Sequence, residues 1–233
     1  MIQSCRAIFF DAGGTLFHPY PSVGEIYAEV ASRHGCRVRA EALEKQFRDI
    51  WAHRNGLTSL ASHSNEKEER QWWHCLVKEV FAPFGVIRNF ETFFDELYDV
   101  FARPSSWQLY PEVPEVLEAL HQRGKFLGIV SNWDSRLFQL CRGLDVEKYF
   151  RFILASAVFG SSKPNPKIFH EALRRSGFSH AETAHVGDSL EDDIRGAQSV
   201  GIQAVCIHRH GGSSFEMLKG KIPVIADLRE LLA

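Results

Sequence analysis

The 233-residue chain lacks several features that would assign a protein to a class at once. No apolar run approaches the roughly 20 residues that a membrane-spanning helix needs, so we expect no membrane partner. Charge of one sign is not in excess, because 27 basic residues stand against 29 acidic ones and the formal net charge is −2. This balance gives no electrostatic footprint for nucleic acid, and we expect no nucleic-acid partner either.

Cysteine is scarce and scattered. The five cysteines form no C-x-x-C pair, and an odd, dispersed set is typical of reduced thiols in a cytosolic protein. The segment "MIQSCRAIFF" enters a strand pattern at once and lacks the layout of a signal peptide. We therefore expect a cytoplasmic protein, with a sizeable core because 45% of its residues are hydrophobic.

The distribution of hydrophobic residues predicts an α/β fold. From residue 111 onward, short apolar runs alternate with helical periodicity, as in βαβ units. Right-handed crossovers between such units give a doubly wound parallel sheet with helices on both faces. The predicted strands are 7–10, 125–132, 150–156, 183–188, 203–208 and a short one within 222–232.

A purely helical region follows the first strand. Four amphipathic segments occur there with no strand between them, which predicts a small helical bundle. Stretches rich in Pro and Ser, "HPYPS" and "RPSSW", mark its two ends. We therefore predict a core formed by residues 1–17 and 110–233, and a helical insert formed by residues 18–109.

Polar side chains stand at the ends of four predicted strands or in the loops that follow them. Because ligands of open α/β sheets bind beyond the carboxyl ends of the strands, these groups should converge at one rim. An acid that ends a buried apolar strand also needs a partner. The residues are Asp11, Ser131 with Asn132, Lys163, and Asp188 with Asp192 and Asp193 shortly after it.

Four of these residues also have a purely structural interpretation, whereas Asp11 and Asp188 are harder to explain in this way. Ser131 alone is more typical of a helix N-cap than of a ligand. Lys163 fits an exposed loop lysine, and Asp192 and Asp193 fit acids favoured by the dipole of a helix's first turn. The complete set nevertheless favours a site, whereas "HRHGG" (208–212) favours a solvated loop over a metal site.

The order and spacing of these residues resemble the haloacid dehalogenase superfamily. The motifs are Asp11-x-x-Gly14-Thr15, Ser131-Asn132, Lys163-Pro164 and Gly187-Asp188-x-x-x-x-Asp193. The resemblance covers the whole chain, and "SNWD", "RQWW" and "SKPNPKIFHEAL" resemble one subgroup in particular. It implies a Rossmann-like core and identifies the helical insert as a type 1 cap.

The resemblance also implies a site for phosphoryl transfer on a small phosphorylated substrate. Asp11 would be the nucleophile that forms an acyl phosphate, with Lys163 and Ser131 as further catalytic residues. The implied substrate-binding residues are Asn132, Thr15 and Gly14, with Ser131 and the Asn132 amide at a helix N-terminus.

A magnesium ion, which prefers hard oxygen ligands, is implied at the same place. The implied metal residues are Asp11, the carbonyl of Gly13, Asp188 and Asp193. Asp193 would orient Lys163 or metal-bound water, and Asp192 is the alternative for that role.

Gly13 departs from the superfamily's pattern. Its phosphatases usually carry Asp two residues after the nucleophile, where it protonates the leaving group and then activates water. Such a group contributes about 10²–10⁴ in rate. Glycine does neither, although we expect it to keep the metal-binding carbonyl and to leave room beside the nucleophile.

Three functions follow from this departure. The first is a magnesium-dependent phosphatase (EC 3.1.3 class) that is slow or specialised for good leaving groups. The second is a 2-haloacid dehalogenase or a phosphonate-cleaving enzyme. In the phosphonate-cleaving enzyme, Lys45 would be the Schiff-base lysine. The third is a catalytically impaired member that binds a phosphate compound or a protein. The retained Asp188 and Lys163 favour phosphate and metal binding over dehalogenation, and we expect the first function. The candidate cleft residues are Trp51, Arg54, Trp72 and Trp133.

Overall fold

The computed structural model describes residues 2–54, 56–57, 64–209 and 222–233. The described chain builds a six-stranded sheet in the order β5-β4-β1-β6-β7-β8, with every neighbouring pair parallel. Its strands are β1 (Ala7–Phe10), β4 (Phe126–Ser131), β5 (Phe152–Ala155), β6 (Thr183–Gly187), β7 (Gln203–Ile207) and β8 (Val224–Ile225). The predicted parallel α/β sheet is confirmed.

Strand β1 lies in the middle of the sheet and buries both of its faces. Successive side chains of a strand point to opposite faces. Ile8 and Phe10 therefore join one hydrophobic cluster, and Ala7 and Phe9 join another on the opposite side. This explains why the strand is a continuous apolar run with no polar alternation.

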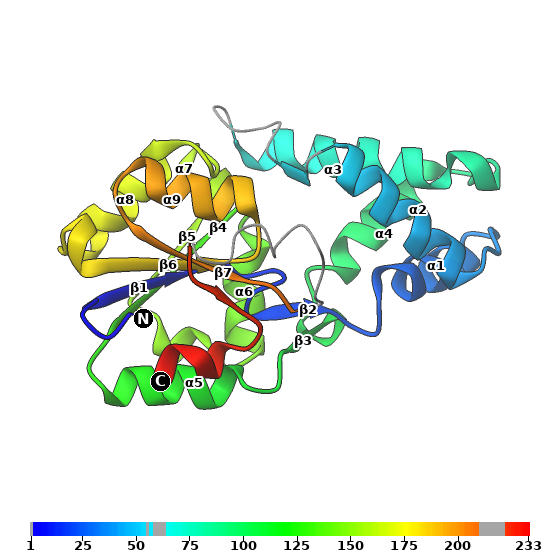
Figure 1. Ribbon diagram of the computed structural model, residues 1–233. Helices are drawn as coiled ribbons and strands as arrows, with labels where there is room; N and C mark the ends of the chain where they lie inside the picture. Colours follow the sequence, from blue (N-terminus) through cyan, green and yellow to red (C-terminus); the bar gives the residue numbers. More distant parts are fainter. Residues whose placement is uncertain (1, 55, 58–63, 210–221) are drawn as a thin grey trace.

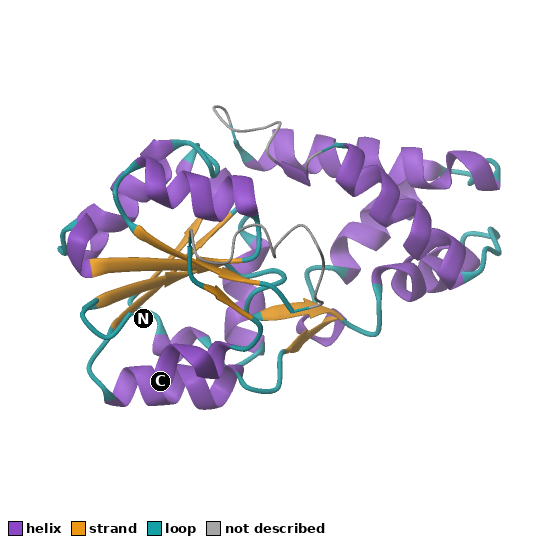
Figure 2. Cartoon of the chain, viewed as in Figure 1, coloured by secondary structure: helices purple, strands orange, loops and turns teal. Residues whose placement is uncertain are grey.

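Helices cover both faces of this sheet (Figure 2). Residues of α8 and α9 pack in one cluster, and residues of α5, α6 and η7 in the other. The helices are α5 (Val113–Gln122), α6 (Arg136–Gly143), α7 (Ser156–Phe159), α8 (Pro166–Ser176) and α9 (Gly196–Ser199). Shorter turns are η4 (Glu147–Tyr149), η5 (His180–Glu182), the π-helical η6 (Leu190–Arg195) and η7 (Leu228–Leu232).

Four further α-helices of the described chain lie to one side of the sheet, away from its strands (Figure 1). They have a hydrophobic cluster of their own, in which Tyr27 stacks on Phe81 with ring centroids 5.8 Å apart. We call this part the helical unit. It contains α1 (Val23–Arg33), α2 (Ala40–His53), α3 (Glu66–Phe81) with η2 (Ala82–Phe84), and α4 (Phe90–Val100).

A two-stranded antiparallel ladder joins the helical unit to the sheet. Its strands are β2 (Phe17–Pro19) and β3 (Trp107–Leu109), the second preceded by η3 (Pro104–Ser106). Phe17 pairs with Leu109, and Pro19 pairs with Trp107. The chain therefore enters and leaves the helical unit through one shared ladder, which the hydrophobic pattern did not predict.

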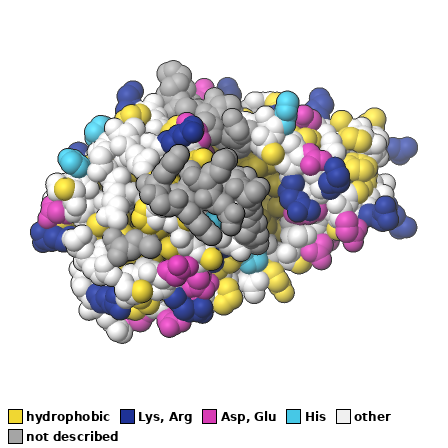
Figure 3. Space-filling model, in the orientation of Figure 1, with side chains coloured by type: hydrophobic (Ala, Val, Ile, Leu, Met, Phe, Trp, Pro, Cys, Tyr) yellow, Lys and Arg dark blue, Asp and Glu magenta, His cyan; other side chains and the backbone are white. Residues whose placement is uncertain are grey.

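The visible surface carries no extended field of one charge. Lysine and arginine side chains are interspersed with acidic ones over both the sheet region and the helical unit (Figure 3). Within the described ranges, no helix is long and apolar enough to cross a membrane.

Candidate active site

Asp11 follows β1 directly, and two donors hold its carboxylate. The hydroxyl of Ser131, the last residue of β4, donates to Asp11 Oδ1 at 2.8 Å. The ammonium of Lys163 donates to the same oxygen at 2.6 Å. Three predicted site residues from separate segments thus meet at one carboxylate, and both contacts fix its orientation in the cleft.

Asn132 clamps the main chain of Lys163. Its side-chain oxygen accepts from the Lys163 backbone N–H at 2.7 Å, and its amide nitrogen donates to the Lys163 carbonyl at 2.9 Å. The side chain of Asn132 is therefore a positioning group for the lysine. The predicted helix N-terminus at this point is wrong, because α6 begins only at Arg136.

Asp193 holds Lys163 from the other side. Its Oδ1 accepts from Lys163 Nζ at 2.6 Å and lies 2.9 Å from Nε2 of His185, while Oδ2 accepts from the Ser189 N–H at 3.0 Å. Burial opposes ionisation here, but the lysine and the histidine outweigh it and lower the pKa of Asp193. Burial likewise opposes the charge of Lys163, yet Asp11 and Asp193 together raise its pKa.

The π-helical turn η6 explains how Asp193 reaches this place. The Ile194 N–H bonds to the Ser189 carbonyl, five residues back, and the wide turn carries Asp193 inward. A Cβ at Gly187 would lie 2.2 Å from Asp193 Cγ, so the strand must end in glycine. Asp192 lines the cavity as well, but Asp193 makes the contact with Lys163.

His185 is a site residue that the sequence did not single out. It lies on β6, is fully buried, and packs edge-on against Phe169. A histidine within the apolar run 183–187 was the available signal, since a buried imidazole needs a polar partner. Here that partner is Asp193, so His185 supports the acid that positions Lys163.

Asp188 completes a group of three carboxylates. Oxygens of Asp11, Asp188 and Asp193 lie within 4.8 Å of one another. Asp188 is solvent-accessible as a residue, but its carboxylate lies against the loop that follows Asp11, where a Cβ on Gly14 would be 2.4 Å from Oδ2. Desolvation of this carboxylate, followed by the charges of Asp11 and Asp193, raises the pKa of Asp188 well above its usual range.

This arrangement fits a hard divalent cation. Three clustered carboxylates face the single buried ammonium of Lys163, and burial also raises the pKa of Asp11. A cation beside Asp11 and Asp188 would relieve that repulsion. Asp193 already uses both oxygens in hydrogen bonds, so among the predicted metal residues it is placed to orient Lys163. Gly13 lines the same cavity.

Thr15 ends the loop that follows Asp11. It is fully buried and is not among the residues that line the cavity, so this placement gives no support to its predicted contact with substrate. Its carbonyl accepts from Arg209 Nη2 at 2.6 Å, and Arg209 pairs with Glu112 at 2.6 Å. Thr15 therefore anchors the loop to the end of β7.

The space beside Gly13 is occupied by Trp133. A Cβ at Gly13 would lie 3.0 Å from Cζ3 of the Trp133 ring. That ring is packed on Phe17 and Trp107, with centroids 5.7 and 5.0 Å away. A Cβ at this position would be in tight contact with the indole ring, so the expectation that glycine leaves open room beside Asp11 is not supported.

A cavity of about 500 Å³ opens from Asp11 toward the helical unit. Of the residues proposed for the cleft, Trp51 and Trp133 line it. Arg54 instead pairs with Glu79 at 2.6 Å, and Trp72 belongs to the core of the helical unit. Lys45 is exposed and pairs with Asp49, outside the cavity.

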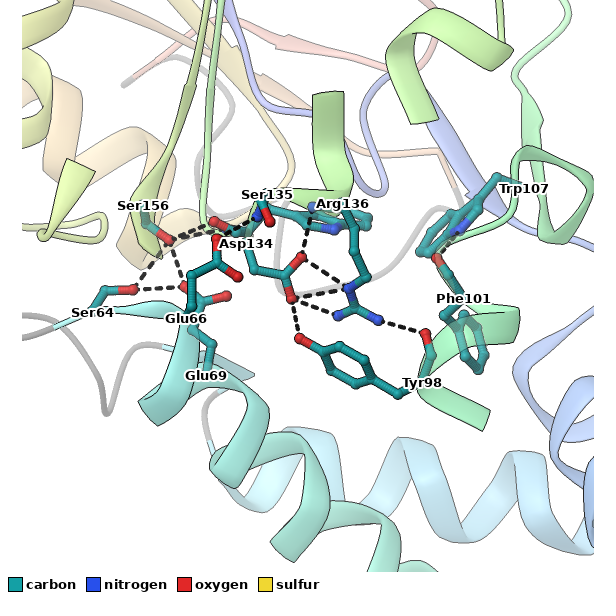
Figure 4. Close-up of polar contacts among 11 residues, drawn as sticks. Ser64, Glu66, Glu69, Tyr98, Phe101, Trp107, Asp134, Ser135, Arg136 and Ser156 are labelled. Carbon is teal, nitrogen blue, oxygen red and sulfur yellow. Dashed lines mark hydrogen bonds and ion pairs between the residues drawn. The ribbon is translucent and has the colours of Figure 1, made fainter. Parts of the chain in front are cut away.

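Polar contacts fasten the helical unit to the core beside this cavity (Figure 4). Glu69 of α3 accepts from the hydroxyls of Ser64 and Ser156 at 2.6 and 2.7 Å. Tyr98 of α4 donates to Asp134 at 2.6 Å, and Arg136 donates to the Tyr98 carbonyl at 3.0 Å. The Glu69–Ser156 bond reaches α7 of the core, and the bonds of Tyr98 with Asp134 and Arg136 reach the segment that follows β4.

The pH dependence of stability should report on Glu69. Burial raises the pKa of this carboxyl to about 7, despite hydrogen bonds from two serines. An acid with a raised folded-state pKa gives up stability as pH rises from its unfolded pKa to its folded one. We therefore expect Glu69 to cost about 3 kcal/mol of unfolding free energy between pH 4.5 and 7.

Glu69→Gln removes this titration and should flatten the curve over that window. The measurement is denaturant unfolding across a pH series, with Glu68→Gln, an exposed neighbour on the same helix, as the matched control. A Glu69→Gln profile that runs parallel to the parent's between pH 4.5 and 7 would contradict the expectation.

Comparison with known proteins assigns the class. The sequence matches the haloacid dehalogenase-like hydrolase family over residues 5–201, and the chain belongs to this family of hydrolases. It is similar to haloacid dehalogenase-like hydrolase domain-containing protein 3 of Mus musculus, with 34% identity over 204 residues, 87% of this chain and 81% of the relative. That group is the subgroup which "SNWD", "RQWW" and "SKPNPKIFHEAL" resemble.

Other relatives differ in their described activities. A glyceraldehyde 3-phosphate phosphatase of Methanopyrus kandleri is 32% identical over 209 residues, 88% of this chain and 84% of that protein. The structure is similar to a HAD phosphatase of Thermococcus onnurineus, with TM-score 0.66, 26% identity, and 97% and 95% of the two chains covered. A 2-haloacid dehalogenase of Pseudomonas syringae pv. Tomato gives TM-score 0.63, 25% identity, and 98% and 96% coverage.

Proposed function

We propose that the chain is a magnesium-dependent phosphatase that hydrolyses a small phosphorylated substrate through an aspartyl-phosphate at Asp11. One observation carries the proposal: Ser131 and Lys163 hold the Asp11 carboxylate beside a second carboxylate, Asp188, at the bottom of a cavity. The two phosphatase relatives support the same chemistry. Five unpaired thiols among the described residues support a reducing compartment such as the cytoplasm.

In the first half-reaction, Asp11 attacks phosphorus in line with the leaving oxygen. A P–O bond forms to the carboxylate while the bond to the leaving group breaks with its electron pair. Lys163 is a fully buried cation within 2.6 Å of Asp11, so it neutralises charge on the transferred oxygens. The Ser131 hydroxyl donates a hydrogen bond to the same carboxylate oxygen of Asp11. Asn132, Asp193 and His185 act through Lys163 and hold it in position.

In the second half-reaction, a water oxygen attacks the same phosphorus, the bond to Asp11 breaks, and phosphate leaves. Mg²⁺ held by Asp11, Asp188 and the Gly13 backbone would neutralise charge on the phosphoryl group when bound. Residues 18–109 would act as a cap that covers the cleft and excludes water during the first half-reaction.

The alternatives receive less support from the site. A phosphonate-cleaving reaction needs a Schiff-base lysine from the helical unit at the cleft, and the candidate Lys45 is ion-paired at the surface of α2. A dehalogenase of this superfamily needs no metal, so it would not need the second carboxylate, Asp188, beside Asp11. A catalytically impaired member that binds a phosphate compound is the second candidate, because Trp133 fills the position beside Gly13.

The test is a panel of phosphate monoesters assayed for phosphate release with Mg²⁺ and with EDTA. We expect release from at least one ester, abolished by EDTA and restored by Mg²⁺. Halide release from 2-chloropropionate is measured in parallel. Release of halide, with no phosphate from any ester, would replace the phosphatase with a dehalogenase.

Magnesium should also stabilise the fold through Asp188. At a Mg²⁺ concentration 100-fold above its Kd, binding to the native state adds about 2.7 kcal/mol to the unfolding free energy. We expect Asp188→Ala to lose this gain, measured as the magnesium-dependent shift in Tm, while the exposed-surface control Asp49→Asn keeps it. An Asp188→Ala shift equal to the parent's would place the ion elsewhere.

A further inference from the structure

The walls of the active-site cavity differ sharply between its two ends. At the core end stand charged side chains, among them Asp11, Lys163 and Asp188. The residues that the helical unit contributes, as far as the structure describes them, carry no charged side chain and are mostly aromatic or aliphatic. The cavity therefore accepts a charged group at one end and an apolar group at the other.

Aromatic rings form the apolar end. Trp51 and Trp73 lie nearly parallel there, with ring centroids 5.6 Å apart and an interplanar angle of 22°. Phe47 also stacks on Trp51, at 5.8 Å and 25°. A flat, apolar ligand that lies against these rings would gain offset-stacked or edge contacts.

Several of the polar groups near this end are already engaged in hydrogen bonds. The Tyr98 hydroxyl donates to Asp134, and the Trp107 indole N–H donates to the Phe101 carbonyl at 3.0 Å. Arg136 is held by Asp134 and the Tyr98 carbonyl. A leaving group rich in hydroxyls, such as glycerol or a sugar, would lose its water here against mostly apolar walls, which costs binding free energy.

The loop around Gly13 also favours an aromatic alcohol as the leaving group. With Trp133 packed at Gly13, the chain has no side chain at that position to protonate a departing oxygen. A phenolate departs readily without a proton because its conjugate acid has a pKa near 10, whereas an alkoxide is about as basic as hydroxide, whose conjugate acid has a pKa of 15.7. The ring that replaces the acid also adds a flat apolar wall.

We propose that the substrate class is the monophosphate ester of an apolar aromatic alcohol, an aryl phosphate, whose ring occupies the cavity between Trp51, Trp73 and Trp133. This rests on the proposed function of the site. Asp11 forms a bond to phosphorus and the P–O(aryl) bond breaks; the phenolate leaves with the electron pair and takes a proton from water. A second water then splits the aspartyl-phosphate, so that ester and water give a phenol and inorganic phosphate.

The test compares three substrates on the full chain with Mg²⁺: 1-naphthyl phosphate, acetyl phosphate and glycerol 1-phosphate. Acetyl phosphate has a good leaving group without a ring, so it separates reactivity from fit. We expect kcat/KM for 1-naphthyl phosphate to exceed that for glycerol 1-phosphate by at least about 100-fold. We also expect its KM to lie at least about tenfold below that of acetyl phosphate.

A substitution of Trp73 tests where the naphthyl ring binds. Trp73→Leu should raise KM for 1-naphthyl phosphate about tenfold and leave KM for acetyl phosphate within twofold. Phe90→Leu, a half-buried aromatic of the helical unit outside the cavity, should change neither. Equal changes for both substrates in Trp73→Leu would overturn the assignment of the aromatic end.

Binding of phosphonate analogues distinguishes a failure of the aryl-phosphate proposal from a failure of the phosphatase proposal. The parent should bind 1-naphthylphosphonate at least about tenfold more tightly than methylphosphonate, measured by quenching of tryptophan fluorescence. Preferred hydrolysis of glycerol 1-phosphate, or equal binding of both phosphonates, overturns the aryl class and leaves the phosphatase standing. Tight binding of the naphthyl analogue with no ester hydrolysed refutes the phosphatase and supports the aromatic pocket.

Discussion

Asp11→Asn is expected to lower phosphate release by at least about 10⁴-fold, because a neutral amide oxygen is a far poorer nucleophile toward phosphorus than a carboxylate. The amide keeps the size of the side chain and still offers an oxygen to Ser131 and Lys163. Lys163 also keeps its second carboxylate, Asp193. The loss should therefore appear in kcat, with the folded structure preserved.

The measurement is phosphate release with the best substrate of the panel, alongside circular dichroism and Tm for the folded state. Asp49→Asn makes the same chemical change at an exposed position of α2 and should leave kcat unchanged. A folded Asp11→Asn variant that keeps more than about a hundredth of the parent's kcat would show that Asp11 is not the nucleophile.

Gly13→Asp combined with Trp133→Ala is expected to raise hydrolysis of an alkyl phosphate up to about 100-fold, the lower range of acid/base effects. The two changes belong together because the Trp133 ring stands 3.0 Å from a Cβ at position 13 and is fixed by two aromatic neighbours. The backbone of Gly13 is not in the left-handed region, so a carboxylate is compatible with the loop. Gly13→Asp alone should gain much less.

The comparison runs over four proteins: the parent, each single variant and the double variant. Relative to Trp133→Ala, the double variant should show the gain on glycerol 1-phosphate. Adding Gly13→Asp in that background should change 1-naphthyl phosphate little, because its leaving group needs no proton. A double variant that binds magnesium, judged by the shift in Tm, and gains nothing on any alkyl phosphate would favour the binding-protein alternative.

Much of the core was predictable because its signals are local. The run 7–10 is apolar without alternation, and in the structure both faces of β1 are indeed buried. Strand ends follow directly from such runs, and parallel strands bring their carboxyl ends to one edge. Chain order and topology therefore predict that Asp11 and Ser131, and the loop with Lys163, lie at one edge of the sheet, whereas the contacts among them come from the structure.

Other features depend on geometry that no local pattern carries. The strands β2 and β3 have three residues each, which is too short to show periodicity. They also pair with each other although the whole helical unit lies between them in the chain. The π-helical turn that places Asp193 reads in sequence as an ordinary helix. Trp133 was considered for the cleft, but its position beside Gly13 depends on packing against Phe17 and Trp107.

The β2–β3 ladder has a consequence for how the chain folds and diverges. Because Phe17 and Leu109 are paired in register, the whole helical unit is topologically one long hairpin loop that leaves the sheet region and returns to it. The entropy of closing a loop grows only with the logarithm of its length, so a larger or smaller insert changes the stability of the sheet region little. Recombination between these two positions would exchange the aromatic end of the cavity while the nucleophile and its partners stay in place.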